Sequence, residues 1–241
     1  MTLVGVLGYM PHSHERYEAR FPSGFRTPEA EKPEWGKFKK KRKVSSGPLM
    51  SQTGLSSLQE PAISRGEILV IPDPNFQTRN VAIVTGAASG IGRATAIALA
   101  VNGLTVVGLD LDEKGGRETG EMAQGMGGRV ILAKADLTQD EDIRKSVLQA
   151  QEYGVIKFLA NIAGIQHINA IEDFPLEKYD LMQRLMLRAP FYLSKLCIPR
   201  MKASSDGTGV IGNMSSVHGH LVTKNKPVYN ITKFGLRGLS Q

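Results

Sequence analysis

The chain has 241 residues, of which 41% are hydrophobic and 22% are charged, and its formal net charge is +7. This composition is typical of a globular protein, and the length allows one large domain or one domain with an appendage. No apolar run approaches the roughly 18 residues of a membrane-spanning helix, and no basic leader precedes the apolar N-terminus. We therefore expect a cytoplasmic protein with no membrane partner.

Residues 1–78 form the first predicted region. They hold most of the 12 prolines and sustain no period of 3.6 or 2. We therefore expect an N-terminal extension that is disordered or drapes over the domain after it. The run Lys39–Val44 is typical of a nuclear import signal, but a solvated charge run has the same composition. A nucleic-acid partner is the weaker interpretation, because only Trp35 and Phe38 supply aromatic rings nearby.

Residues 79–241 alternate short apolar segments with helical patterns. This alternation predicts an α/β fold with a doubly wound parallel sheet, the Rossmann fold. Strands are expected at 81–84, 104–108, 130–133, 156–160 and 210–214. Helices are expected at 91–101, 112–124, 140–153, 176–201 and 228–241. Open parallel sheets bind ligands at the carboxyl ends of their strands, so we expect the site at that edge.

A glycine-rich turn follows the first of these strands. Gly86 suits the positive φ of a tight turn, and Gly90 and Gly92 allow a ligand to approach the backbone. The next helix would direct its free N–H groups at a pyrophosphate. Asp110 lies near the offset at which a carboxylate meets the adenosine ribose, and it would repel a 2′-phosphate. The pattern predicts a dinucleotide site that prefers NAD, with helix capping as another interpretation of Asp110.

A second constellation lies near the end of the chain. Tyr229 and Lys233 are four residues apart in a predicted helix and so share one face. A cation beside a phenol lowers its pKa from about 10, which a general acid/base near neutral pH requires. Ser216, after the last predicted strand, could hydrogen-bond a substrate oxygen. The Tyr-Lys spacing alone also fits a surface pair, but its combination with the glycine turn favours catalysis.

These motifs, with Asn161-x-Ala163-Gly164, resemble the short-chain dehydrogenase/reductase family across residues 79–241. The resemblance implies NAD(P) binding and hydride transfer at an alcohol carbon. It implies that Tyr229 exchanges the hydroxyl proton, Ser216 orients the oxygen, and Lys233 lowers the tyrosine pKa. No metal-ligand spacing is present in the sequence. The implied cofactor-binding residues are Gly86, Ser89, Gly90, Ile91, Gly92, Asp110, Asp136, Leu137, Asn161, Ala163, Gly164, Tyr229 and Lys233.

Three further residues suggest the substrate. Within the family, the segments around Gln166, His218 and Lys226 are most similar to the D-3-hydroxybutyrate dehydrogenase branch. The resemblance implies that these three surround the carboxylate of a short 3-hydroxy acid such as 3-hydroxybutyrate. An amide, an imidazole and an ammonium are suitable donors to a carboxylate, although His218 alone also reads as an ordinary loop histidine. We expect a small hydroxy acid or alcohol as partner, and the family's paired helices imply a homo-oligomer.

Two departures from the family pattern leave an alternative open. Counting along the long helix places Met186 where the family has a relay asparagine, and a thioether cannot hold the relay water. The sequence also ends within the Tyr–Lys helix, which predicts a fold incomplete at its C-terminus. These departures favour an NAD-binding remnant with impaired turnover, whereas the complete Ser–Tyr–Lys set favours a working NAD-dependent oxidoreductase. A nuclear or nucleic-acid-associated protein is the third interpretation.

Overall fold

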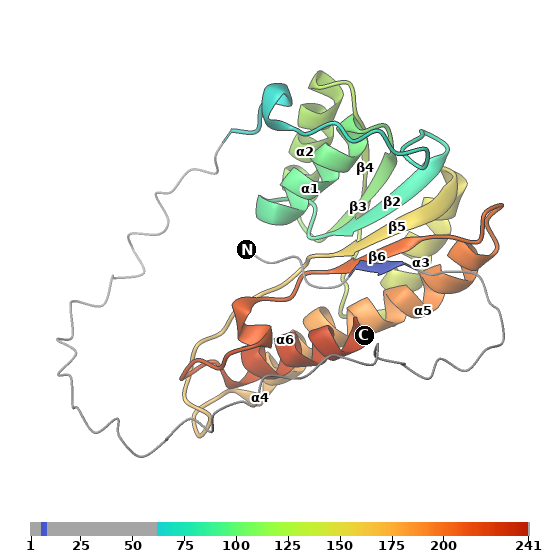
Figure 1. The fold of residues 1–241 in the computed structure, drawn as a ribbon. Helices are drawn as coiled ribbons and strands as arrows, with labels where there is room; N and C mark the ends of the chain where they lie inside the picture. Colours follow the sequence, from blue (N-terminus) through green and yellow to red (C-terminus); the bar gives the residue numbers. More distant parts are fainter. Residues whose placement is uncertain (1–5, 9–61, 241) are drawn as a thin grey trace, which may run out of the picture. The chain divides into compact units, whose positions relative to one another are not determined.

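The computed structural model describes residues 6–8 and 62–240. In this part of the chain six strands form one sheet in the order β1-β6-β5-β2-β3-β4 (Figure 1). The strands β2 to β6 run parallel, and β1 pairs antiparallel with β6 at the edge. The run Lys39–Val44 lies outside the described residues, as does most of the predicted extension. The strand bounds are β1 (Val6–Gly8), β2 (Asn80–Thr85), β3 (Thr105–Asp110), β4 (Arg129–Lys134), β5 (Val155–Asn161) and β6 (Val210–Asn213).

Helices cover both faces of this sheet, which confirms the predicted doubly wound α/β fold (Figure 1). None of the helices in the described ranges is long and apolar enough to cross a membrane. The strand β1 comes from the N-terminal region and is not among the strands that the sequence predicts. The helix bounds are α1 (Gly90–Val101), α2 (Glu113–Gly125), α3 (Asp140–Glu152), α4 (Leu176–Gln183), η3 (Arg184–Arg188), α5 (Ala189–Lys202) and α6 (Pro227–Leu239), with short 3-10 turns η2 (Arg65–Glu67) and η4 (Val217–Gly219).

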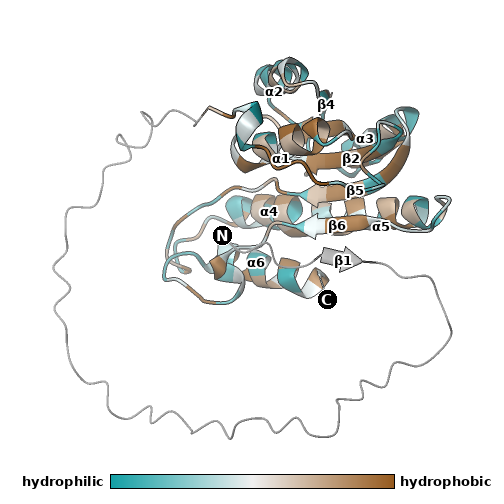
Figure 2. Ribbon diagram, turned by 45° about the horizontal axis from the view of Figure 1, so that its top comes forward, coloured by the Kyte–Doolittle hydropathy of each residue, from teal (hydrophilic) through white to brown (hydrophobic). Residues whose placement is uncertain are grey.

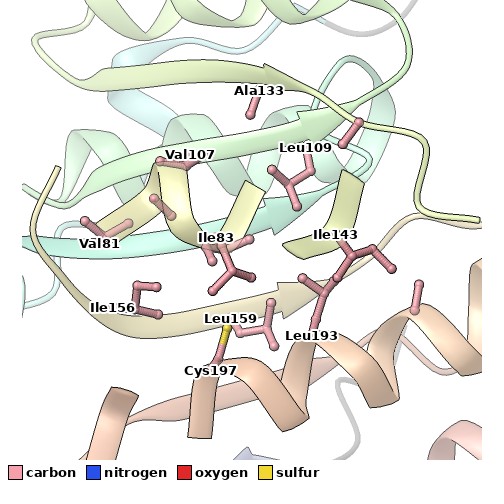
Figure 3. Close-up of a cluster of buried hydrophobic side chains, with 14 of the residues drawn as sticks. Val81, Ile83, Val107, Leu109, Ala133, Ile143, Ile156, Leu159, Leu193 and Cys197 are labelled. Atoms are coloured by element: carbon pink, nitrogen blue, oxygen red, sulfur yellow. The ribbon is translucent and has the colours of Figure 1, made fainter. Parts of the chain in front are cut away.

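Two large apolar clusters of the described residues lie on opposite faces of the sheet, and a smaller third cluster contains Met182, Met186 and Val228. Val81 and Ile83 of β2 belong to the cluster that includes Leu193 and Cys197 of α5 (Figure 3). The alternate residues of β2 belong to the other cluster, with α1. A strand that is buried on both faces has a nearly continuous apolar sequence, and β2 is accordingly coloured mainly as hydrophobic in Figure 2. Burial of each such side chain contributes about 1.5–3 kcal/mol.

Cys197 is fully buried in the first of these clusters. Desolvation raises the pKa of its thiol to about 12, so the nucleophilic thiolate is scarce at neutral pH. Cys197 therefore serves as a small apolar side chain of the core.

Residues 62–78, in the second half of the predicted extension, lie against the α1 face. Ile63, Ile68 and Phe76 pack on the cluster there. Asn102, at the end of α1, accepts a hydrogen bond from the backbone N–H of Ile71 at 2.7 Å. Residues 62–78 therefore contribute to the packing on this face of the domain.

The long helix predicted over 176–201 is present, but a π-helical turn interrupts it. This turn, η3, separates α4 from α5 and has Met186 at its centre. Pro190 follows in the first turn of α5 and has no N–H to donate to the carbonyl of Met186, four residues earlier. The missing hydrogen bond favours a locally widened turn at this point.

Candidate active site

A cleft of about 1110 Å³ lies at the carboxyl ends of the strands. It is bounded by the glycine turn after β2, the ends of β3 and β4, the segment after β5, and the start of α6. A cleft of this size is large for a small-molecule site, since such pockets run to about 1,000 Å³. It is lined by fourteen of the predicted residues, namely Gly86, Ser89, Gly90, Ile91, Gly92, Asp110, Asp136, Leu137, Ala163, Gly164, Gln166, Ser216, Tyr229 and Lys233.

Three predicted site residues are not among those that line the cleft. The Asn161 amide is buried and donates to Asn213 Oδ1 at 2.8 Å, which joins β5 to β6. His218 is half-buried, and its Nδ1 lies 3.1 Å from Ser216 Oγ. Lys226 occupies the position before α6, where its backbone carbonyl accepts from Asn230 at 2.9 Å.

The glycine turn takes the shape that the sequence predicts. Gly86 and Gly90 have φ of 71° and 53°, in the left-handed region that favours glycine. A Cβ on Gly92 would lie 1.8 Å from the Gly86 carbonyl oxygen, so no other residue fits there. Ser89 caps α1 without a side-chain hydrogen bond among the described residues, and the first turn of that helix lines the cleft. The turn therefore offers a helix N-terminus and a close backbone approach to an anionic ligand.

Two buried polar side chains that the sequence analysis did not select clamp this turn from behind. The Arg93 guanidinium donates to the Ala88 carbonyl and, through Nε, to Thr119 Oγ1 at 3.0 Å. The Thr119 hydroxyl is 2.9 Å from both the Ala87 and Gly115 carbonyls, either of which can accept its hydrogen. The clamp ties the turn to α2. The signal in the sequence was an arginine on the inward face of a helix, where a charge requires partners.

Asp110 supports the glycine turn through hydrogen bonds and also lines the cleft. Its Oδ2 accepts from the Ala88 backbone N–H at 2.9 Å, and its Oδ1 accepts from the Asp112 N–H at 3.1 Å. The cap of α2 is Asp112, whose side chain accepts from Lys114 and Gly115. Helix capping therefore belongs to Asp112. The two Asp110 oxygens each keep a lone pair that can accept from the hydroxyls of a ribose in the cleft.

Thr85 positions the wall opposite the glycine turn. Its hydroxyl accepts from the backbone N–H groups of Ile162 and Ala163 at 2.8 and 3.0 Å. A Cβ on Gly86 would lie 3.0 Å from the Ala163 Cα, so the turn and this wall are closely packed. Thr85 is the last residue of β2 and was missed because its partners lie 77 and 78 residues further along the chain.

The helix α6 places Tyr229 and Lys233 on the cleft, one turn apart. The Lys233 ammonium lies 5.5 Å from the centre of the Tyr229 ring and donates to the Met214 carbonyl at 2.7 Å. Desolvation lowers the pKa of Lys233 to about 8. A phenol and a buried ammonium, two groups that acid/base chemistry at an alcohol can use, therefore lie side by side at the cleft.

Ser216 reaches the cleft from the segment that follows β6. Its hydroxyl oxygen accepts from the His218 backbone N–H at 3.2 Å and lies 3.1 Å from His218 Nδ1. The His218 ring in turn packs edge-to-face on Tyr229, with ring centres 5.5 Å apart. A hydroxyl, a phenol and an ammonium thus lie on the same cleft as the glycine turn, and together they can exchange a proton with a bound alcohol.

Comparison with known proteins agrees with this arrangement. Residues 80–241 match the family described as short chain dehydrogenase. The chain belongs to this family. It is 36% identical over 162 residues to a D-beta-hydroxybutyrate dehydrogenase of Cupriavidus necator, covering 66% of this chain and 62% of that enzyme. It is 31% identical over 169 residues to a cyclohexanol dehydrogenase of Acinetobacter, covering 69% of this chain and 66% of that enzyme.

A solved structure gives the same result for the fold. A metagenomic short-chain oxidoreductase in complex with NADP has a TM-score of 0.64 and 28% identity, covering 68% of this chain and 74% of that one. The chain thus spans about two thirds of the length of these short-chain dehydrogenases. The glycine turn, with its room for a close ligand, and the free lone pairs of Asp110 fit the pyrophosphate and ribose of a nicotinamide dinucleotide.

Proposed function

We propose that the chain is a dehydrogenase that oxidises a small secondary alcohol, or reduces the ketone, with a nicotinamide dinucleotide. The observation that carries the proposal is that Ser216, Tyr229 and Lys233 line the same cleft as the glycine turn. The bound cofactor would accept the hydride from the alcohol carbon. Tyr229 takes the hydroxyl proton as the C–O bond becomes C=O, and Ser216 holds the substrate oxygen. Lys233 favours the phenolate that receives this proton.

We propose NAD as the preferred cofactor. Asp110 lines the cleft beyond the glycine turn, and its carboxylate would repel a 2′-phosphate. Leu111, which follows it, offers no cation to hold that phosphate. Titration of the purified chain with both cofactors should give tighter binding of NAD. Asp110→Ser should reduce the ratio of the NADP and NAD dissociation constants at least tenfold, since two like charges in contact repel by several kcal/mol. Tighter binding of NADP to the unmodified chain would contradict the assignment.

The proposed substrate is a short 3-hydroxy acid such as 3-hydroxybutyrate. One relative named above is a D-beta-hydroxybutyrate dehydrogenase, and Gln166 lines the cleft as an amide donor suited to a carboxylate. A neutral alcohol is the competing substrate, because another relative is a cyclohexanol dehydrogenase and Ile165, Leu185 and Val217 also line the cleft. The ratio of kcat/KM for 3-hydroxybutyrate and for cyclohexanol decides between them.

The test of the activity is reduction of NAD by the purified 241-residue chain, with Tyr229→Phe as matched variant. Removal of the phenolic hydroxyl should lower turnover by roughly 10²–10⁴-fold while cofactor binding persists. Equal turnover by the two proteins would rule out Tyr229 as the acid/base.

A second candidate is a nucleotide-binding protein of the same family with impaired turnover. It is supported by Met186, which is buried directly beneath the cleft, 3.2 Å from where a Cβ on Gly164 would lie. A thioether there offers little to a water-mediated proton path. NAD binding without turnover of either alcohol by the 241-residue chain would favour this candidate.

A further inference from the structure

Two consecutive residues that follow β6 hold Lys233 at two points. The Lys233 ammonium donates to the Met214 carbonyl at 2.7 Å. The backbone carbonyl of Lys233 accepts from the Ser215 hydroxyl at 3.2 Å. Because a carbonyl can only accept and an ammonium can only donate, the direction of both hydrogen bonds is fixed. The segment that leads into Ser216 is therefore joined to α6 through both the side chain and the backbone of one lysine.

The contact between Ser215 and Lys233 is closely packed. Ser215 is 8% exposed, and Lys233 is 3% exposed. Gly219, in the turn η4, lies against this contact: a Cβ there would be 2.4 Å from Ser215 Oγ and 2.9 Å from the Lys233 carbonyl oxygen. The backbone of η4 approaches so closely because residue 219 has no side chain. The Ser215 hydroxyl is therefore confined beside the helix.

A count of hydrogens separates the roles of the two neighbouring serines. Ser215 and Ser216 both line the cleft, so either hydroxyl could face a substrate. A serine hydroxyl has a single hydrogen, and the Lys233 carbonyl accepts that of Ser215. While this contact lasts, Ser215 has no hydrogen to donate to a substrate oxygen. Its hydroxyl acts on α6 instead.

A second joint between β6 and α6 lies at the far end of the helix. There Asn213 Nδ2 donates to the hydroxyl of Ser240, the C-cap of α6, at 3.0 Å. Tyr229 is in the first turn of α6, one turn before Lys233 and at the opposite end from this joint. The position of the phenol relative to the strand end therefore depends more directly on the Ser215 contact than on the Asn213 joint.

We infer that Ser215 is a positioning residue: its hydroxyl bonds to the Lys233 carbonyl and so fixes the Tyr229 phenol relative to the Ser216 hydroxyl. The inference rests on the proposed dehydrogenase function. Proton exchange with a bound alcohol requires the phenol and the Ser216 hydroxyl to reach the same oxygen atom, and a misplacement of about 1 Å can lower the rate about a hundredfold. Ser215 thus contributes to turnover without donating to the substrate.

Ser215→Ala removes this contact and leaves the helix its own hydrogen bonds. In the helical ladder of α6, the Lys233 carbonyl also faces the backbone N–H of Arg237, four residues later, and so keeps a partner in the variant. Ser194→Ala is the matched control, because Ser194 is also 8% exposed and also donates to a helix carbonyl, that of Pro190 at 2.7 Å. Ser194 does not line the cleft. The two variants should therefore lose similar stability.

The first experiment measures turnover of 3-hydroxybutyrate and of cyclohexanol at a temperature at which urea unfolding shows both variants to be folded. Ser215→Ala should lower kcat by a factor between about 5, the value of one ordinary hydrogen bond, and about 100. The factor should be the same for both alcohols, and KM should change less than kcat. Ser194→Ala should keep the kcat of the unmodified chain.

Two results of this experiment would overturn the inference. An unchanged kcat in Ser215→Ala would show that the contact does not serve turnover. A loss that appears mainly in KM, or with one alcohol only, would place the Ser215 hydroxyl on the substrate.

A double-mutant cycle distinguishes positioning from general damage to the fold. If Ser215 acts through the phenol, its hydroxyl matters only while the phenol is present. In a Tyr229→Phe background, Ser215→Ala should therefore lower the remaining turnover less than about twofold. The same loss in both backgrounds would indicate a purely structural role and would overturn the inference.

The last experiment needs no activity. The six tyrosines are replaced by 3-fluorotyrosine, and the ¹⁹F signal of residue 229 is identified by its absence in Tyr229→Phe. Ser215→Ala should shift this signal and Ser194→Ala should not. A signal that does not move in Ser215→Ala overturns the inference whatever the turnover. A shifted signal in a chain that turns over neither alcohol would refute the dehydrogenase and support the positioning of Tyr229 by Ser215.

Discussion

The two ends of the cleft are built differently. At the cofactor end, Arg93 and Thr119 are buried polar groups that hold the glycine turn from behind. At the substrate end, two loops expose large apolar side chains, with Ile171 and Val222 about three quarters exposed. Regions with few buried contacts open at little cost, whereas a clamped turn does not. Substitutions at the cofactor end should therefore act mainly on folding and cofactor binding, and substitutions at the substrate end should act mainly on substrate choice.

The largest effect should come from Gly92→Ala. The new Cβ would lie 1.8 Å from the Gly86 carbonyl oxygen, so the turn must move, and we expect a loss of more than about 4 kcal/mol of unfolding free energy. Cofactor binding should disappear with it. Gly125→Ala is the matched control, because among the described residues nothing lies within 4 Å of its Cβ. Urea unfolding measures the loss of stability, and NAD titration measures the loss of binding. Equal results for Gly92→Ala and Gly125→Ala would show that the turn does not require glycine at position 92.

The next effect concerns Lys233 and pH. Its folded pKa of about 8 lies below the ordinary value of 10.5, so the unfolded state binds more protons between these values. Burial of the charge costs stability in full below about pH 8, and this cost is relieved as the pH rises toward 10.5. Lys233→Met removes this cost and should therefore be more stable than the unmodified chain at pH 7. This difference in unfolding free energy should shrink between pH 8 and 10.5, by up to about 3 kcal/mol. Urea unfolding of both proteins at pH 7 and 10 measures this, and a pH-independent difference contradicts it.

A smaller effect is expected from Thr119→Val, which keeps the side-chain shape and removes the hydroxyl. Thr119 is fully buried, so the Arg93 Nε and the Ala87 carbonyl lose a partner, at about 1–3 kcal/mol. NAD affinity should fall together with stability, because the Arg93–Thr119 clamp holds the glycine turn on which the cofactor would bind. Ser194→Ala, at a buried hydroxyl that donates to the Pro190 carbonyl at 2.7 Å and does not line the cleft, is the control for loss of a hydroxyl. Unchanged NAD affinity in Thr119→Val would show that the turn holds its shape alone.

The sequence predicted what is encoded locally. The glycine turn, the alternation of strands and helices, and the Tyr229–Lys233 spacing each depend on residues near one another, and the structure brings them onto one cleft. The Arg93–Thr119 clamp depends instead on where α2 packs against α1, which spacing does not determine. The hydroxyl of Thr85 found its partners only through the register of β2 and β5.

The same reasoning applies at the substrate end. The prediction of one uninterrupted helix over 176–201 overlooked the hydrogen bond that Pro190 cannot make. His218 was selected for its chemistry, and the contacts of its ring nitrogens with Ser216 and Thr223 depend on loop conformation, which the sequence did not indicate. Loops carry specificity and are also the parts whose conformation a single sequence encodes least directly.

The smallest predicted effect distinguishes Gln166 from Lys226. Gln166 lines the cleft, so its amide can donate to a substrate carboxylate without moving, and loss of a hydrogen bond to a charged group costs about 1.5–3 kcal/mol. Lys226 is not among the lining residues, and any attraction it exerts acts through solvent, where charge pairs contribute about 0.2–1 kcal/mol. Substitution of Lys226 by Ala keeps its backbone carbonyl, which accepts the first hydrogen bond of α6 from Asn230. We therefore expect Gln166→Ala to lower the kcat/KM ratio of 3-hydroxybutyrate to cyclohexanol more than tenfold, and Lys226→Ala to lower it about fivefold or less. An unchanged ratio in both variants would argue against a substrate that carries a carboxylate. A larger effect from Lys226→Ala than from Gln166→Ala would indicate that the ammonium, rather than the amide, binds the carboxylate.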